Sequence, residues 1–294
     1  MNTNAKTIQI YLPGGDPRGI RVAEITTHIV QVIEVPRSQI KAFLEMPELL
    51  ENSPVAVYFL FGATEDGQDQ VYIGQTGNIR MRLNDHNAKK DFWQRALILV
   101  TTNRNFTQTH ALFLEWYCLQ EAAKAERYRC ENGNAGSRPH TPAPLAADCA
   151  AIFEAGKILL STLGYPLFEA IAQADPGTAN ELYYCKAVGS DARGLYTEDG
   201  FVVLKGSTGR AANVTSIVGT SDERFREKLI DSDVMKVEGD KVVFQRDHLF
   251  LSPSMAAIAV LGRTANGWLE WKNKDGKSLH EMKRLALTEG QDAP

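Results

Sequence analysis

The chain lacks the features that mark membrane and exported proteins. No stretch approaches the ~20 consecutive apolar residues that a membrane span needs. The N-terminal sequence MNTNAKTIQIYLPGGDP has no basic start followed by an apolar block, so no secretory signal is expected. Internal repeats and low-complexity tracts are also missing, which argues against a solenoid or a long disordered linker. These absences predict a cytoplasmic globular protein without a membrane partner.

Cysteine is scarce, and the charge is nearly balanced. The 4 cysteines form no CxxC pair, so paired zinc ligands are missing and free thiols are expected. The net charge of −4 is not that of a general nucleic-acid binder. Residues 79–104, however, hold six basic residues against two acidic ones, a local excess of four. This excess predicts either a solvated helix face or a surface that contacts phosphates.

The 294 residues are enough for two domains. Val- and Ile-rich runs predict strands in a small β-rich N-terminal extension, residues 1–50. Residues 51–175 predict a domain of mixed strands and helices, followed by a linker over Gln173–Asn180. Strand and helix patterns resume over residues 181–287. The prediction is an α+β protein with a domain boundary near residue 175.

The middle segment alternates strand and helix patterns. Val55–Phe61 and Val71–Ile73 predict a hairpin, with turns expected at Gly74 and Gly77. Asn78 is a suitable cap for a helix that continues to about Ala88. The remaining predicted elements are a strand at Ala96–Thr101, a helix from Thr107 or Thr109 to about Tyr128, and a helix at Leu145–Leu163.

Polar residues in this segment carry the candidate chemistry. Glu115 lies in an apolar helical stripe, where an ionised carboxylate is costly unless it is paired or holds a metal. It is therefore a buried structural ion pair, a residue at a partly exposed helix edge, or a functional group that is a metal ligand or a general acid or base. Arg82 and His86 are four residues apart and share one helical face. An arginine can bind a phosphoryl group through two hydrogen bonds, and a histidine can move protons near neutral pH.

The order of these residues resembles the GIY-YIG nuclease signature. The resemblance rests on Val57-Tyr58, Tyr72-Ile73-Gly74, Thr76, Asn78, Arg82-Leu83, His86 and Glu115, and it covers roughly residues 54–126. Ala56 departs from the family pattern, which has glycine there, and a negative φ would make the extra methyl group tolerable. Gln75 stands where some relatives carry a lysine that assists a tyrosine.

The resemblance implies a three-stranded antiparallel sheet flanked by helices and a metal-dependent endonuclease that hydrolyses DNA. Glu115 would hold Mg²⁺ or Mn²⁺, and Arg82 would steady the scissile phosphate. Tyr72 would be closest to the attacking water, Tyr58 would contact the phosphate or the water, and His86 would assist them. Which of Tyr58, Tyr72 and His86 is the general base stays open. The further nucleic-acid contacts expected in this domain are Thr76, Asn78, Arg80, Lys89 and Lys90.

The C-terminal part is similar to the uncharacterised domain often fused to bacterial GIY-YIG domains, and to a restriction-enzyme and adenine-methylase-associated module. This resemblance implies DNA contacts, for which Lys205, Ser207, Thr208 and Arg210 are the candidates. The segment lacks the glycine-to-lysine spacing of a P-loop. Trp268 and Trp271 are expected on a strand after an Asn-Gly turn.

Two other functions stay open beside the nuclease. A catalytically inactive nucleic-acid-binding protein or a protein-interaction adaptor could keep the same fold. Retention of all five candidate site residues favours the nuclease, acting in defence against foreign DNA or in repair. Residues 1–50 carry no recognisable chemistry, so two roles stay open for them: covering a sheet edge, or contacting a partner protein or a second copy of the chain.

Overall fold

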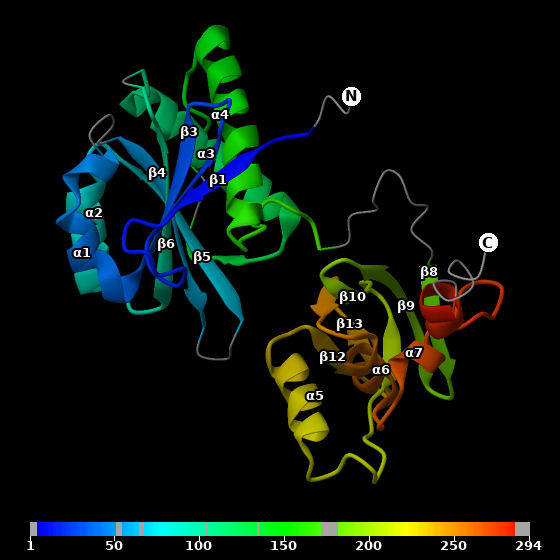
Figure 1. The fold of residues 1–294 in the computed structure, drawn as a ribbon. Coiled ribbons are helices and arrows are strands. Elements are labelled where there is room, and N and C mark those ends of the chain that lie inside the picture. The colour runs from blue at the N-terminus through cyan, green and yellow to red at the C-terminus, as the bar shows by residue number, and fades with distance from the viewer. Residues whose placement is uncertain are drawn as a thin grey trace. The chain divides into compact units, whose positions relative to one another are not determined.

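A computed structural model of the chain describes residues 5–50, 55–64, 68–103, 105–133, 136–171 and 182–285. The chain divides into two compact units, residues 1–170 and 171–294, which Figure 1 shows in blue to green and in green to red. The predicted linker Gln173–Asn180 lies outside the described residues. Each unit contains a large sheet and several helices, so the α+β class is confirmed.

The first unit is built on one seven-stranded sheet in the order β1-β2-β3-β6-β4-β5-β7, antiparallel except for the β5–β7 pair. Its elements are β1 (Ile8–Tyr11), β2 (Arg21–Ile25), β3 (Val30–Pro36), η1 (Arg37–Gln39), α1 (Ile40–Leu44), η2 (Pro47–Leu50), β4 (Ala56–Ala63), β5 (Asp69–Thr76), α2 (Ile79–Lys89), β6 (Trp93–Thr101), α3 (Gln108–Ala125), β7 (Arg129–Cys130) and α4 (Ala143–Thr162).

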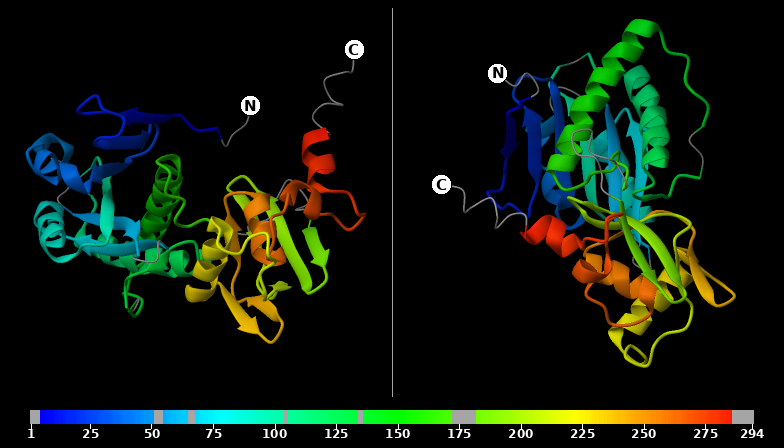
Figure 2. Two further views of the ribbon diagram at one scale, coloured as in Figure 1. Left: turned by 90° about the horizontal axis from the view of Figure 1, so that it is seen from below. Right: turned by 90° about the vertical axis from the view of Figure 1, so that its right-hand side faces the viewer.

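Both faces of this sheet are covered, with α1 and α2 on one side and α3 and α4 on the other (Figure 2). Side chains of a strand point alternately to opposite faces, so β4 is buried on both. Val57, Phe59 and Phe61 join the core under α3 and α4. Ala56, Tyr58 and Leu60 join the core under α1 and α2. Tyr58 therefore faces α2, the helix that carries Arg82 and His86.

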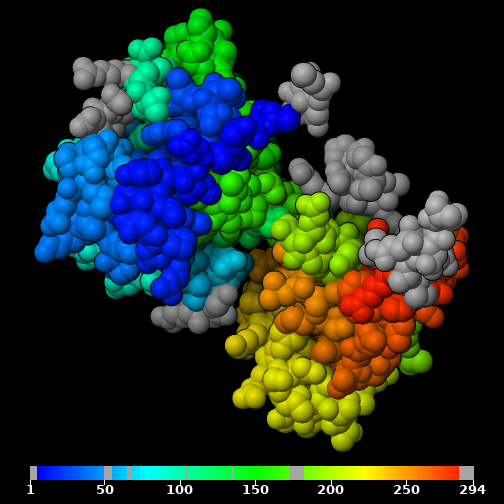
Figure 3. Space-filling view, viewed as in Figure 1, coloured from blue at the N-terminus to red at the C-terminus, as the bar shows by residue number. Residues whose placement is uncertain are grey.

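The sheet is larger than the three strands that the sequence implied. β4, β5 and β6 are antiparallel neighbours as expected, but the strands of residues 1–50 continue the same sheet through a seven-residue pairing of β3 with β6. In space-filling view these N-terminal strands, in blue, form one continuous surface with the neighbouring segments (Figure 3). The N-terminal extension is thus an integral part of the sheet.

A buried carboxylate ties the N-terminal strands to the rest of the unit. Glu34 on β3 is 1% exposed and forms ion pairs with Arg21 on β2 and with Arg95 on β6, the latter at 3.2 Å. The Tyr165 hydroxyl, just beyond α4, donates to the same carboxylate at 3.3 Å. A buried charge needs such partners, because losing one leaves it uncompensated. Four separate parts of the chain therefore meet at one side chain.

The second unit contains a sheet in the order β12-β13-β11-β9-β10-β14, with β8 also paired to β9. Its elements are β8 (Leu182–Ala187), β9 (Ser190–Thr197), β10 (Gly200–Val203), β11 (Thr208–Arg210), α5 (Ser221–Asp231), β12 (Met235–Glu238), β13 (Lys241–Phe244), β14 (His248–Phe250), α6 (Pro253–Leu261), α7 (Gly267–Glu270) and the π-helical turn η3 (Glu281–Leu285). The small residues of α6 are buried in the core of this unit.

The strand predicted around the two tryptophans is wrong. Trp268 lies in the short helix α7, which begins because the Asn266 side chain accepts a hydrogen bond from the Trp268 backbone N–H. Trp271 follows the helix, is fully buried, and donates its indole N–H to the Pro253 carbonyl. Asn-Gly here caps a helix, the other local structure that an asparagine side chain favours. Among the described residues of the chain, no helix is long and apolar enough to cross a membrane.

Candidate active site

The hairpin of β4 and β5 places two tyrosines on the face that α2 covers. Val71 and Ile73 are in the core under α3 and α4, so Tyr72 and Gly74, between and beyond them on β5, face the other way. The predicted turn at Gly74 is wrong, because β5 continues to Thr76. Ala56 lies in the regular ladder opposite Thr76 and has no positive φ. The alanine is thus accommodated as expected.

Gly74 is the residue that makes room for the Tyr58 ring. The two are direct cross-strand partners. A Cβ atom at Gly74 would lie 2.3 Å from the Tyr58 hydroxyl oxygen and 2.4 Å from its Cζ atom, which no side chain tolerates. The phenol therefore lies flat across β5 instead of standing above β4. This position carries its hydroxyl toward α2.

The Tyr58 hydroxyl ends beside the imidazole of His86. The distance from Tyr58 Oη to His86 Nε2 is 2.8 Å. The Tyr72 ring lies 6.2 Å from the Tyr58 ring and 5.3 Å from the His86 ring, measured between centroids. Tyr58 is 1% and His86 7% exposed, whereas Tyr72 is half-buried. Of the three rings, Tyr72 is the one that solvent reaches.

Burial sets the protonation states of Tyr58 and His86. Desolvation, followed by the Tyr72 hydroxyl nearby, raises the pKa of Tyr58 far above its ordinary value. Desolvation, together with the cations Arg82 and Lys90, lowers the pKa of His86 to about 4. At neutral pH both groups are therefore uncharged, and the His86 nitrogen facing Tyr58 can accept its proton when the hydroxyl donates to it.

Glu115 reaches the same region from α3, at the open edge of β5. Thr107 begins this helix through a capping box with His110. The Glu115 carboxylate is half-buried, and desolvation raises its pKa, while a hydrogen bond from the Gln75 backbone and the charge of Arg82 act in the opposite direction. Arg82 itself is exposed, and its charge acts on Tyr58, His86 and Glu115 alike. The charges of Arg82 and Glu115 both act on Tyr58, so these two residues lie in the same part of the unit as the cluster of Tyr58, Tyr72 and His86.

Three further polar residues support this arrangement: Lys90, predicted above as a nucleic-acid contact, and Glu131 and Asn132, to which the sequence did not point. Lys90, just beyond α2, holds its Nζ 4.4 Å from the centroid of the Tyr72 ring, and the Glu131 carboxylate accepts from it at 2.7 and 2.8 Å. Asn132 bonds both the N–H and the carbonyl of Ile73. Glu131 and Asn132 are about 60 residues from β5 in sequence, so no local pattern pointed to them.

The other predicted nucleic-acid contacts of this unit differ in their placement. Thr76 accepts from the Asn78 N–H, and Asn78 caps α2 by accepting from the Met81 N–H, so the cap prediction is confirmed. Arg80 is half-buried: it donates to the Leu44 carbonyl at 2.8 Å, and one of its guanidinium nitrogens is buried without a partner. Lys89 is exposed. Lys89 is thus the basic side chain of this set that phosphate can reach most freely.

Most of the side chains predicted to contact nucleic acid in the second unit instead form hydrogen bonds with the backbone of that unit. Ser207 is 1% exposed and exchanges two hydrogen bonds with the Arg193 backbone, so its assignment as a phosphate contact is wrong. Thr208 bonds the Asp191 backbone in the same way. Arg210 is half-buried and donates to the Val188 carbonyl. Lys205 alone among the four is exposed. The segment is the start of β11, not a phosphate loop.

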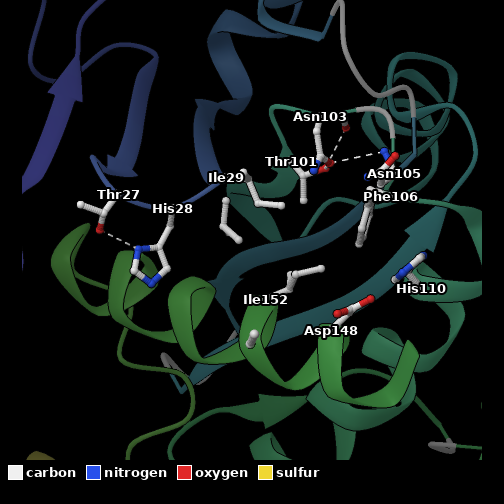
Figure 4. A pocket seen from close by; sticks show the side chains of 12 residues that line it. Thr27, His28, Ile29, Thr101, Asn103, Asn105, Phe106, His110, Asp148 and Ile152 are labelled. Atoms are coloured by element: carbon white, nitrogen blue, oxygen red, sulfur yellow. Dashed lines mark hydrogen bonds between the residues drawn. The ribbon is translucent and has the colours of Figure 1, made fainter. Parts of the chain in front are cut away.

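A hollow of about 430 Å³ lies at another part of the first unit, between the β2–β3 turn, the end of β6 and the helices α3 and α4. Figure 4 shows Asp148 and His110 near one end and His28 at the other. None of the five predicted site residues lines it. Among its described lining residues there is no lysine or arginine, so its polar rim does not favour a phosphate.

The neutral state of His86 predicts that the first unit loses stability in mild acid. The His86 pKa is 6.5 when unfolded and about 4 when folded. Above pH 6.5 the contribution of neutral His86 to the free energy of unfolding is complete, because neither the folded nor the unfolded chain binds a proton at this residue. As the pH falls toward 4 the unfolded chain takes up a proton that the folded one does not, which costs at most about 3 kcal/mol. Hydrogen–deuterium exchange of β4 and β6 peptides would measure this loss.

The matched variants are His86→Gln and His248→Gln. Burial, and then Arg246, also lowers the pKa of His248, to about 4, but His248 lies in the second unit. We expect His86→Gln to flatten the acid dependence of exchange in the first unit and His248→Gln to leave it unchanged. An unaltered acid dependence in His86→Gln would show that His86 is not the group responsible.

Comparison with known proteins identifies part of the chain. Residues 183–283 match a family described as Domain of unknown function (DUF4357), within the second unit. This agrees with the predicted presence of an uncharacterised module in the C-terminal part. No curated protein and no solved structure matches the chain. The family match does not extend into the first unit, so the GIY-YIG resemblance there rests on the residues and their arrangement.

Proposed function

We propose that the first unit is a GIY-YIG-type, divalent-metal-dependent phosphodiesterase, and that the chain is an endonuclease acting on DNA. One observation carries the proposal: Tyr58, Tyr72 and His86, from β4, β5 and α2, pack together, and the charges of Arg82 on α2 and Glu115 on α3 act on Tyr58. A cytoplasmic setting, in defence against foreign DNA or in repair, belongs to the same proposal.

Glu115 is suited to hold Mg²⁺ or Mn²⁺. Its carboxylate is half-buried without an ion-pair partner among the described residues. Within the same residues no group of three metal-ligating side chains surrounds it. One carboxylate, with water and substrate phosphate supplying the other oxygens, is a common way for proteins to hold Mg²⁺. A bound ion would stabilise negative charge on the phosphoryl oxygens and the leaving oxygen.

Arg82 is suited to bind the scissile phosphate. Its guanidinium has no hydrogen-bond or ion-pair partner in the described part of the chain, and it projects from the exposed side of α2. It is nevertheless close enough to lower the pKa of Glu115 and of His86. A cation held in that position stabilises the charge that develops on the phosphoryl group in the transition state.

The tyrosines and His86 form a path for the proton of the attacking water. Tyr72 reaches solvent, Tyr58 lies behind it, and His86 is the last of the three groups in this path. As the water oxygen bonds to phosphorus, the bond from phosphorus to the leaving oxygen breaks. The water's proton would pass to Tyr72 Oη, the Tyr72 proton to Tyr58 Oη, and the Tyr58 proton to His86 Nε2, which leaves His86 as an imidazolium. The negative charge of a bound phosphate raises the pKa of His86, so the site becomes a better proton acceptor when substrate is present. Tyr58 then acts on His86, not on the phosphate.

Arg82→Ala tests the proposal directly. We expect cleavage of plasmid and of single-stranded DNA in Mg²⁺ or Mn²⁺ to fall by about a hundredfold or more, because one stabilising donor is lost from the transition state. The matched control is Arg18→Ala, since Arg18 is 89% exposed in the same unit and far from α2 in sequence.

Two outcomes would contradict the nuclease. Wild-type protein that cuts no substrate faster than Arg82→Ala would favour the alternative of an inactive protein that keeps this fold. DNA binding without cleavage would then indicate a nucleic-acid-binding role, and the loss of both would indicate a protein-interaction role. Equal losses in Arg18→Ala and Arg82→Ala would mean that general surface charge, not the site, drives cleavage.

A further inference from the structure

The second unit contains a cleft of about 530 Å³ whose walls are rich in lysine. It is lined by Tyr184, Lys186, Glu270, Lys272, Asn273, Lys274 and Gly276, all within the residues that match DUF4357. None of these residues was a candidate in the sequence. Lys186, Lys272 and Lys274 are exposed, so their ammonium groups can reach a ligand from three points on the rim.

The cleft is a rigid part of the fold. Its two walls are joined by a pair of backbone hydrogen bonds between Tyr184 and Lys272, at 2.7 and 3.0 Å. The loop that carries Lys274 is a tight turn, in which the Asn273 side chain accepts from the N–H groups of Asp275 and Lys277. Gly276, at φ +80°, closes the turn. The buried Trp271 anchors this wall to the core, so the lysines start from fixed backbone positions.

The charge balance of the cleft is positive. Its one acidic lining residue, Glu270, pairs with Arg263 at 2.6 Å, which leaves the three lysines in excess. Asp191 lies 3.8 Å from Lys186, but both side chains are about two-thirds exposed, and such pairs are weak. The Glu281 carboxylate accepts hydrogen bonds from the backbone N–H and the hydroxyl of Ser278, and Asp275 is exposed in the turn. An anionic ligand is therefore favoured.

The kind of cation in the cleft, exposed lysine, indicates which kind of anion it binds. Exposed lysines are hydrated point charges that bind phosphates without reading bases. Each such contact is weak, and it becomes useful when a polyanion engages several at once and releases its counterions. Lys186 Nζ also lies 5.5 Å from the centroid of the Tyr184 ring, so that ring is a wall of the cleft and not a free platform for stacking a base.

We propose that this cleft binds the phosphodiester backbone of a polynucleotide through Lys186, Lys272 and Lys274. It replaces the segment at residues 205–210 as the main phosphate-binding surface of the second unit. The choice of a polynucleotide rests on the proposed nuclease function, but the cleft itself needs no catalysis. Binding should be independent of sequence and should weaken steeply with salt.

The test measures binding of the full chain to short fluorescein-labelled single-stranded and duplex DNA by fluorescence anisotropy, in EDTA so that no metal-dependent cleavage occurs. The triple variant Lys186→Gln/Lys272→Gln/Lys274→Gln is compared with Lys228→Gln/Lys236→Gln/Lys241→Gln, which removes the same charge from exposed positions elsewhere in the unit. Circular dichroism checks that both fold.

We expect the cleft variant to bind about tenfold more weakly, and its slope of log affinity against log salt to fall by roughly 2 to 3, as for three lost phosphate contacts. The control should change little. Equal affinity and slope in wild type and cleft variant would overturn the proposal, as would an equal loss in the control or no DNA binding by wild type. Intact binding in EDTA together with no cleavage in a separate assay with Mg²⁺ would instead count against the nuclease alone, so the two proposals fail separately.

Discussion

Replacing Glu115 by glutamine is expected to lower metal-dependent DNA cleavage by about a thousandfold or more, with the fold preserved. The amide has the same shape and keeps an oxygen that can accept from the Gln75 backbone. It lacks the negative charge that a divalent cation requires of its one protein carboxylate. A burial penalty on the charged form also disappears, so the variant should be at least as stable as wild type. Plasmid cleavage in Mg²⁺ and thermal unfolding measure the two effects.

A second readout separates metal binding from catalysis. Binding of Mn²⁺, followed by electron paramagnetic resonance, should be lost in Glu115→Gln. The matched control is Glu121→Gln, on the same helix, where Glu121 pairs with Lys124 at 2.6 Å near the surface. If Glu115→Gln binds Mn²⁺ and cuts DNA as well as Glu121→Gln does, the assignment of the metal to Glu115 is incorrect.

Gly74→Ala is expected to disable the site from a position that carries no functional group. The added methyl group would lie 2.3 Å from the Tyr58 hydroxyl oxygen and 2.4 Å from its Cζ atom, so the phenol must move and give up its hydrogen bond to His86. We expect a loss of about 1–3 kcal/mol in the free energy of unfolding, as for other overpacked cores. A shift of the catalytic side chains of about 1 Å can cost about a hundredfold in rate. Urea unfolding and plasmid cleavage test the two parts.

Gly14→Ala is the control for this substitution, because an added Cβ at Gly14 meets nothing within 4 Å. A double-mutant cycle identifies the cause. In a Tyr58→Ala background the atoms that obstruct the methyl group are gone, so Gly74→Ala should cost little further stability. Full additivity of the two changes would show that Gly74 acts through the backbone and not through Tyr58.

The proximity of four candidate site residues could be predicted because their spacing is local. Tyr58 and Tyr72 follow from a hairpin, and Arg82 and His86 from one helical face, so the pattern of the sequence already brings them near one another. Asn78 was recognised as a cap for the same reason. Glu115 stood out because a carboxylate in an apolar stripe needs an explanation. The role of Gly74 was misjudged, since a glycine in a ladder looks like a turn until its cross-strand partner is known.

The remaining features depend on contacts that sequence periodicity does not specify. Lys90 and Glu131 meet only because β7 pairs with the far edge of β5. The pairing of β3 with β6 joins segments about 60 residues apart, so the N-terminal strands looked separate. Ser207 was taken for a surface residue because a run of small and polar residues is typical of loops, whereas here the hydroxyl satisfies the Arg193 backbone in the interior.

The contact of Glu34 with three other parts of the chain limits where this protein can be truncated. A fragment beginning at residue 51 would keep all five candidate catalytic side chains. It would also strip β3 from β6, leaving an exposed seven-residue strand edge able to recruit other chains, and would leave Arg95 without its carboxylate. Insertion or truncation on the N-terminal side of the hairpin is therefore not neutral. The smallest stable fragment that retains the site must include β2 and β3.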